Sequence, residues 1–276
     1  MRDRIKVLKK GTSSKQARLA AERMVGSVKM TRDHALRVSR ILDGTSYFRE
    51  LPTLRFEVDP RAYFHLSEHP DVTVGLWRAM GISKFRVAKT ARDRYLADSG
   101  DGTKGTIEVV ERDPNHKIIL CGGVFKSPFL PKGIRTRSVI HMQTRFTRDK
   151  SGKTFATHRA FVHVSFPSTT VDTAAKLFSP LGNAVLDRNF REISLFLHVM
   201  SVAMARQPGW VERVAAKMKD ATDQQKKDLM TVTAKVYYSA RAREAAPLFK
   251  TRQEYLRELM RPIKTVHRED GRTSRP

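Results

Sequence analysis

Residues 84–166 alternate between apolar and polar side chains in short stretches, and turn-forming residues separate these stretches. Successive side chains of a β-strand point to opposite faces of a sheet, so the pattern predicts a run of antiparallel strands. Residues 171–206 instead place apolar side chains three and four apart, which predicts one long amphipathic helix. Because the sheet and the helix each have one apolar face, we expect the sheet to wrap around the helix. An imperfect closure between them leaves a cavity.

The clearest hairpin pairs residues 135–147 with residues 154–166 around a turn at 149–152. Its alternation predicts one buried face and one solvated, basic face, as in an antiparallel sheet that water reaches on one side. His141, Phe161 and His163 fall on the face predicted to be solvated. We expect the buried face to meet the apolar stripe of the long helix and to hold a ligand there. The predicted ligand-binding residues are Ile140, Met142, His158, Val162 and Val164 on the hairpin and Leu186, Phe190, Ile193 and Leu197 on the helix.

Shorter elements flank this sheet and helix. Capping residues and helical periodicity predict two helices before residue 43, two more within residues 60–80, and further helices after residue 210. A strand is expected at 53–58, and residues 85–95 read as one strand. The chain thus divides into a basic N-terminal helical extension (1–50), an α+β domain (51–210), a C-terminal helical extension (211–261) and a disordered basic tail (262–276).

Positive charge dominates the chain. It contains 53 lysines and arginines against 28 aspartates and glutamates, a formal net charge of +25. This exceeds the magnitude of about 2–8 that keeps a small domain soluble. Such a field attracts nucleic acid, anionic lipid headgroups or an acidic partner. The predicted anion-binding residues are Arg135, Arg137, Arg145 and Arg159 on the hairpin and Arg18, Arg23, Arg37 and Arg40 in the N-terminal helices.

No apolar run approaches the roughly 20 residues that span a bilayer, so we expect no transmembrane helix. The first residues are charged and lead into no hydrophobic stretch, which argues against a secretory signal. The single cysteine, Cys121, excludes an intrachain disulfide and favours a reducing compartment. We therefore expect a cytoplasmic protein, either free or peripheral at a membrane.

Two motifs match known chemistry by spacing alone. Residues 65–69 fit the H-x-x-E-H zinc signature, but Pro70 ends the expected helix directly after them, so we expect a coincidence. Residues 100–105 fit G-x-G-x-x-G, yet a dinucleotide site needs a helix after the glycines, and here a strand follows. Alternation also places His158 on the opposite face from His141 and His163. The sequence therefore predicts no catalytic residue, no metal and no cofactor.

The order of a strand, two short helices, a strand meander and one long helix resembles the START/polyketide-cyclase-like (SRPBCC) helix-grip superfamily. The resemblance covers residues 53–206, with Phe56 in the first strand and residues 171–206 as the gripping helix. It implies a helix-grip α+β fold that holds a hydrophobic ligand, such as a lipid or polyketide, between sheet and helix. Some members are enzymes. The basic helices at 1–43 and 211–276 are additions to that unit, and they suggest docking to an anionic surface.

Three functions remain open at this point. The first is a non-catalytic protein that holds a hydrophobic or lipid-like ligand and docks on an anionic membrane surface through its basic helices. The second is a nucleic-acid or ribonucleoprotein-associated protein on the same scaffold, although the solvated face offers only Phe161 for stacking on bases. The third is a cyclase- or hydrolase-like enzyme.

Overall fold

The structure, a computed structural model, describes residues 4–100, 103–125, 134–166 and 180–245. These residues form an α+β fold of nine strands and seven helices. The strands are β1 (Ile5–Lys9), β2 (Tyr47–Glu50), β3 (Thr53–Glu57), β4 (Arg86–Ala91), β5 (Arg94–Asp98), β6 (Lys104–Arg112), β7 (His116–Phe125), β8 (Ile134–Arg148) and β9 (Thr154–Ser165). The helices are α1 (Lys15–Gly26), α2 (Arg32–Asp43), α3 (Pro60–Glu68), α4 (Pro70–Ala79), α6 (Pro180–Arg206), α7 (Pro208–Ala216) and α8 (Asp223–Ala245).

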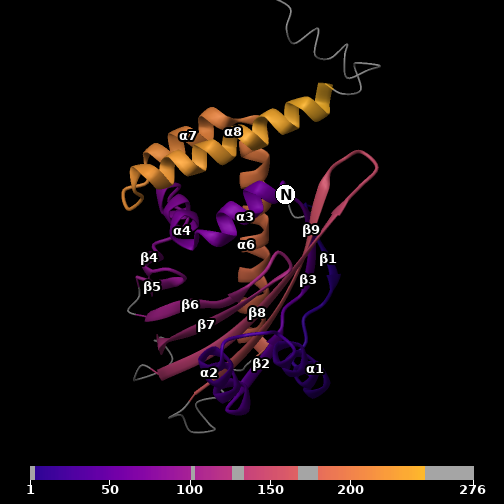
Figure 1. The fold of residues 1–276 in the computed structure, drawn as a ribbon, viewed down its shortest axis with the longest axis vertical. Helices are drawn as coiled ribbons and strands as arrows, with labels where there is room; N and C mark the ends of the chain where they lie inside the picture. The colour runs from indigo at the N-terminus through magenta and orange to yellow at the C-terminus, as the bar shows by residue number, and fades with distance from the viewer. Residues whose placement is uncertain (1–3, 101–102, 126–133, 167–179, 246–276) are drawn as a thin grey trace, which may run out of the picture.

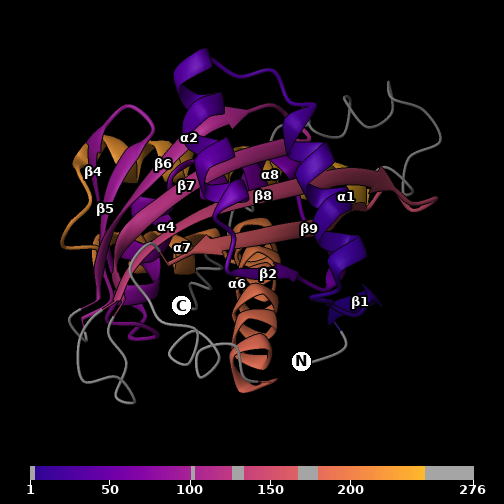
Figure 2. The same cartoon turned by 90° about the horizontal axis from the view of Figure 1, so that it is seen from below.

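All nine strands belong to one antiparallel sheet with the order β1-β3-β9-β8-β7-β6-β5-β4, and β2 pairs with β9 beside β3. The long helix α6 crosses one face of this sheet, and α7 and α8 lie across one end of α6 (Figure 1). Helices α1 and α2 lie on the opposite face (Figure 2). The sheet is therefore sandwiched between helices on both sides at its centre.

Several helices begin at the residues that the sequence predicts. The Ser14 hydroxyl accepts a hydrogen bond from the Ala17 amide at 3.2 Å and caps α1. Asp59 accepts from the Arg61 amide at 2.9 Å, and a proline in the first turn follows it in α3. These polar caps satisfy amides that have no partner within the helix, so they fix where each helix starts.

The main core lies between α6 and the sheet. Val162 is buried there, and Ile140, Met142 and Val164 pack against the same core, which also contains Phe190 and Leu197. Leu186 is partly buried at its edge. Ile193 does not join this core: its side chain is 41% exposed.

The prediction of a solvated outer face is wrong for the middle of the β8–β9 hairpin. His141, Phe161 and His163 are at most 1% exposed. The cause is α1 and α2, whose apolar residues cover this face. Val25, Val38 and Ile41 form a second core with Ile118, Leu120 and Val139 of the sheet.

The N-terminal segment also supplies strands β1 and β2, which the sequence analysis did not predict. Each is only four or five residues long, too short for alternation to be recognised. The single strand expected at 85–95 is a hairpin, β4 and β5, whose turn places Asp93 at φ 63°. Aspartate tolerates this left-handed conformation, so the turn forms without glycine. The last part of the predicted C-terminal helical extension, after residue 245, and the tail at 262–276 lie outside the described residues.

Candidate functional site

An apolar groove of about 540 Å³ lies between α6 and the segment that joins α4 to β4. Its volume is within the range of about 300–1,000 Å³ that is typical of small-molecule sites. Trp77 and Phe85 line one wall, and Ile193 and Phe196 of α6 line the other. The Trp77 and Phe196 rings meet edge to face with their centroids 5.5 Å apart. The two walls thus meet through aromatic side chains from α4 and α6, two helices far apart in the sequence.

Large apolar side chains are exposed around this groove. Ile193 is 41% exposed and Ile82 is 65% exposed, and both line it. Exposed apolar residues that cluster in a hollow indicate a binding surface, whereas single ones on a convex surface do not.

The polar residues that line the groove are Ser83, Asn189 and Glu192. The Glu192 carboxylate accepts from Arg188 Nε at 2.7 Å, one helical turn earlier. No lysine or arginine is among the described residues that line the groove. The polar edge is therefore a hydrogen-bonding one, without a cation to receive an anionic group.

Next to the core side of α6, four side chains form a buried hydrogen-bonded chain. Thr144 Oγ1 and Tyr63 Oη are 2.6 Å apart, Tyr63 Oη lies 2.7 Å from His158 Nε2, and His158 Nδ1 lies 3.2 Å from Ser194 Oγ. The Ser194 hydroxyl donates to the Phe190 carbonyl at 3.0 Å. Burial lowers the pKa of His158 to about 3, so its imidazole is neutral at pH 7.

This chain links α3, β8, β9 and α6 and has a consistent direction. The Ser194 proton goes to the Phe190 carbonyl, so His158 Nδ1–H donates to Ser194 Oγ and His158 Nε2 accepts from Tyr63. Both ring nitrogens of His158 are thus used within the protein. His158, predicted to contact a ligand, thus connects the sheet to α6 and α3 through these two hydrogen bonds.

Further polar contacts fix the two ends of α6. Arg49 of β2 forms two hydrogen bonds with the Asp187 carboxylate, with Nε–Oδ1 and Nη2–Oδ2 distances of 3.0 and 2.5 Å. Nearer the other end, His198 Nδ1 lies 2.7 Å from the Glu57 carbonyl oxygen, and the Ser201 hydroxyl accepts from the Asp59 amide at 2.8 Å. Because α6 is fixed at several points, the wall that it contributes to the groove is preformed.

Of the nine residues predicted to bind a ligand, Ile193 lines this groove and the others pack in or against the core or belong to the His158 chain. Trp77, Phe85 and Phe196 also line the groove, and the sequence did not predict them. Trp77 and Phe196 lie at helical spacing and look like ordinary core residues, since periodicity does not tell which neighbour they face.

Three of the predicted anion-binding arginines are paired with carboxylates. Arg18 pairs with Glu22, Arg37 pairs with Glu108, and Arg159 pairs with the buried carboxylate of Glu50. These contacts make them less available to an external anion. The remaining five are exposed and form no ion pair with any residue in the described ranges: Arg23, Arg40, Arg135, Arg137 and Arg145.

Arg145 belongs to a basic row across four strands. Lys6 of β1 pairs in register with Arg55 of β3, Arg55 with Thr157 of β9, and Thr157 with Arg145 of β8. Register partners project from the same face of a sheet, here the face opposite α6. The Arg55 guanidinium lies 4.2 Å from the centroid of the Phe155 ring. We call Lys6, Arg55 and Arg145 the basic row.

The two histidines of the H-x-x-E-H motif lie against each other at the end of α3. The His65 and His69 rings stack with centroids 4.9 Å apart, and α3 ends at Glu68 before Pro70 opens α4. In the ranges that the structure covers, no group of three His, Cys, Asp or Glu side chains is arranged to hold a metal ion. Within those same ranges, no helix combines the length and apolarity that crossing a bilayer requires.

A scan against protein-family models gives no match for this chain, and no curated protein matches it either.

Proposed function

We propose that this protein is a non-catalytic binding protein for a hydrophobic or lipid-like small molecule, which lies in the groove between α6 and the α4–β4 segment. The observation that carries the proposal is the apolar hollow around Trp77, Ile193 and Phe196. Polar contacts fix α6 to the sheet, so the wall that α6 contributes to this hollow is preformed. The resemblance of residues 53–206 to the helix-grip superfamily supports the same class of ligand. The fold is then a helix-grip variant.

The groove favours an apolar ligand with an uncharged polar group. Ser83, Asn189 and Glu192 offer a hydroxyl, an amide and a carboxylate at its edge. A carboxylate or phosphate placed beside Glu192 would meet like charge, whereas an alcohol or amide would find hydrogen-bond partners. We therefore expect long-chain alcohols to bind better than the corresponding fatty acids.

Binding is favoured over catalysis by the state of the buried His158 chain. A serine, a histidine and a tyrosine are in contact there, but the Ser194 proton is engaged by the Phe190 carbonyl. Ser194 and His158 are also buried, at 0% and 1% exposure, so a substrate does not reach them. General acid–base chemistry requires a group within reach of the substrate's proton.

The experiment uses the two tryptophans of the chain, Trp77 in the groove and Trp210 in α7. A Trp210→Phe variant reports on the groove through Trp77 alone. We expect 1-dodecanol to change its emission saturably, and dodecanoate to do so more weakly. The Trp77→Phe variant, which retains Trp210, should show no saturable change. Native mass spectrometry before and after organic extraction tests for a ligand that copurifies.

A pair of matched variants tests the location of the ligand. Ile193 and Val202 are β-branched residues of α6 that are 41% and 37% exposed, and only Ile193 lines the groove. Ile193→Asn should weaken dodecanol binding at least tenfold, and Val202→Asn should leave it unchanged. Equal affinities in the two variants, or no binding by the wild type, would refute the proposed function.

The basic row supports a second candidate, binding of nucleic acid. Lys6 and Arg145 are exposed, and the strands that carry them are separated by three strand spacings, about 14 Å. Single-stranded RNA should then bind with a steep dependence on salt. A Lys6→Glu, Arg145→Glu double variant should flatten the log–log slope by about 1.4, or about 0.7 per lost phosphate contact. Lys235→Glu, an exposed change on α8, is the control. If the protein binds anionic vesicles and not RNA, the basic row is a membrane-docking surface. This result would be compatible with the proposed binding of a lipid-like ligand.

A further inference from the structure

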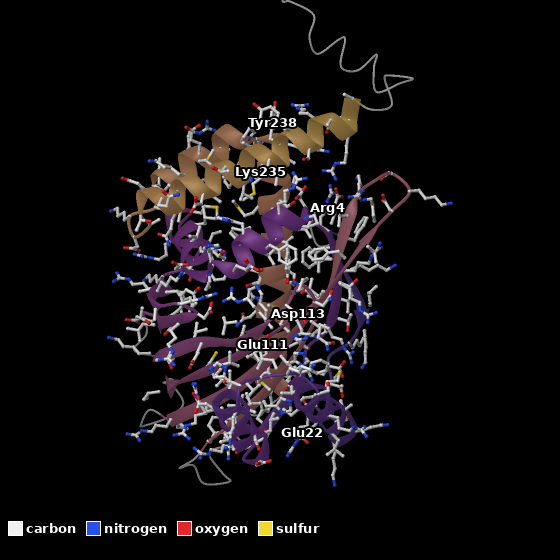
Figure 3. All side chains as sticks on the ribbon, in the orientation of Figure 1. Arg4, Glu22, Glu111, Asp113, Lys235 and Tyr238 are labelled. Carbon is white, nitrogen blue, oxygen red and sulfur yellow. The ribbon has the colours of Figure 1, made fainter. Side chains whose placement is uncertain are left out.

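A second hollow, of about 370 Å³, lies on the face of the sheet opposite α6. The C-terminal end of α1, the turn between β6 and β7, and strand β8 surround it. Figure 3 labels Glu111 and Asp113, which border this hollow from the β6–β7 side. It shares no lining residue with the groove beside α6, so its role is independent of the function proposed above.

A buried histidine without a hydrogen-bond partner faces this hollow. His141 is 1% exposed and lines the hollow, and neither of its ring nitrogens has a partner among the described residues. A buried polar group that forms no hydrogen bond costs about 1–3 kcal/mol of stability. Such a group in a native protein calls for an explanation, and a ligand that hydrogen-bonds to it is one.

A second histidine is oriented toward the same space. His116 Nε2 lies 2.7 Å from Asp113 Oδ2, and the His116 and His141 rings meet nearly at right angles with centroids 5.8 Å apart. His116 Nδ1 is buried without a partner in the part of the chain that the structure covers. When the ring is neutral and Asp113 accepts the proton on Nε2, Nδ1 presents a lone pair as an acceptor.

The Glu111 carboxylate adds a negative charge to the lining. Its described contact is a hydrogen bond at 3.1 Å from the backbone amide of Arg112, and no cation among the described residues pairs with it. Lys29 lies at the rim of the hollow. It is exposed and forms no ion pair with any of the described residues. A half-buried carboxylate without a cation is notable in a protein whose net charge is +25.

We infer that this hollow binds a small organic cation with N–H donors, a guanidinium or a primary ammonium, with Glu111 as its counter-ion and His116 and His141 as acceptors. The lining is rich in acceptors, so a donor-rich ligand completes its hydrogen bonds. A metal ion fits less well, since no three described side chains of the ligating types come together around one point. Burial, followed by the nearby His116 and Arg159, lowers the pKa of His141 to about 4, so its imidazole is neutral at pH 7 and one of its two nitrogens is an acceptor.

The test is an NMR titration of the full chain with methylguanidinium in the millimolar range at constant ionic strength. Methylurea, a neutral molecule of nearly the same shape, is the matched control probe. We expect saturable shifts of the His116 and His141 imidazole nitrogens with methylguanidinium, and none with methylurea. Glu111→Gln should weaken the affinity at least tenfold. Glu212→Gln makes the same charge change on an exposed residue of α7 and should leave the affinity unchanged.

Several results would overturn the inference. Equal shifts with methylurea would remove the role of the ligand's charge, and an unchanged affinity in Glu111→Gln would remove the counter-ion. Absence of any saturable shift would show that the hollow binds no such cation. Stoichiometric binding of Zn²⁺ at these histidines would identify a metal centre in place of the organic cation. These measurements do not depend on dodecanol binding. The inference about the cation can therefore fail while the proposed function holds, and the reverse is also true.

Discussion

Lowering the pH from 7 to 5 should destabilise this protein strongly, because burial lowers the pKa of three histidines far below the ordinary value. His141 and His163 lie under α1 and α2, and His158 lies between the sheet and α6. Burial lowers their pKa values from an ordinary 6.5 to about 4, about 4 and about 3. In the unfolded chain each of them binds a proton near pH 6.5, whereas in the folded protein none does until the pH approaches 4.

The direction and the magnitude of this loss of stability follow from proton linkage. Between pH 6.5 and 4 the unfolded state binds more protons than the folded state, so the free energy of unfolding falls as the pH falls. Each histidine contributes up to about 1.4 kcal/mol per pH unit. Integrated from pH 7 to 5, the three together remove about 5 kcal/mol. That loss is comparable with the whole stability of a typical domain, about 5–15 kcal/mol.

Urea denaturation at pH 7, 6 and 5, followed by circular dichroism, measures this loss directly. The carboxylate Glu108, whose pKa the Arg37 hydrogen bond lowers to about 2, contributes only below pH 4.5 and so lies outside this window. A His163→Leu variant should lose about one third less stability between pH 7 and 5, since it removes one of the three protons. It should not be destabilised at pH 7, because His163 forms no hydrogen bond within the described residues. A free energy of unfolding that is constant from pH 7 to 5 would refute the reasoning.

Three further predictions concern the attachment of α6. Tyr63→Phe should lower the free energy of unfolding, measured with urea, by about 1–3 kcal/mol, because it leaves the partners of a buried hydroxyl unsatisfied. Tyr238→Phe, at a residue 71% exposed, is the control and should change it by less than about 0.5 kcal/mol. Arg49→Leu should cost about 1.5–3 kcal/mol through the loss of its two hydrogen bonds with Asp187, and an equal cost in an Asp187→Asn background would contradict that account. Phe190→Ala should cost about 3–5 kcal/mol because Phe190 is 7% exposed in the main core, and a much smaller cost would indicate a cavity there.

The sequence predicts most elements, because their signals are local. Ser14 and Asp59 mark helix starts through caps that involve neighbours two or three residues away. Alternation also predicts which hairpin residues share a face. It does not predict what covers that face: the apolar residues Val25 and Val38 are visible in the sequence, but nothing local says that they pack on Val139.

The candidate groove was missed for the same physical reason. Its walls come from the end of α4 and the middle of α6, more than a hundred residues apart. Trp77 and Ile193 each look like core positions in their own helix. Only the three-dimensional arrangement shows that the two helices leave a hollow where these side chains meet solvent.

The way the first fifty residues join the sheet has a consequence for synthesis of the chain. Strand β2 pairs only with β9 in the described sheet, and β3, which carries β1, pairs with the same edge of β9 next to β2. At about 5–20 residues per second, β9 leaves the ribosome roughly 5–20 s after β2. During that interval α1 and α2 lack the surface on which they pack. Their nascent apolar faces, beside many basic side chains, are then open to chaperones and to the anionic ribosome surface, and folding of the N-terminal segment must wait for the hairpin.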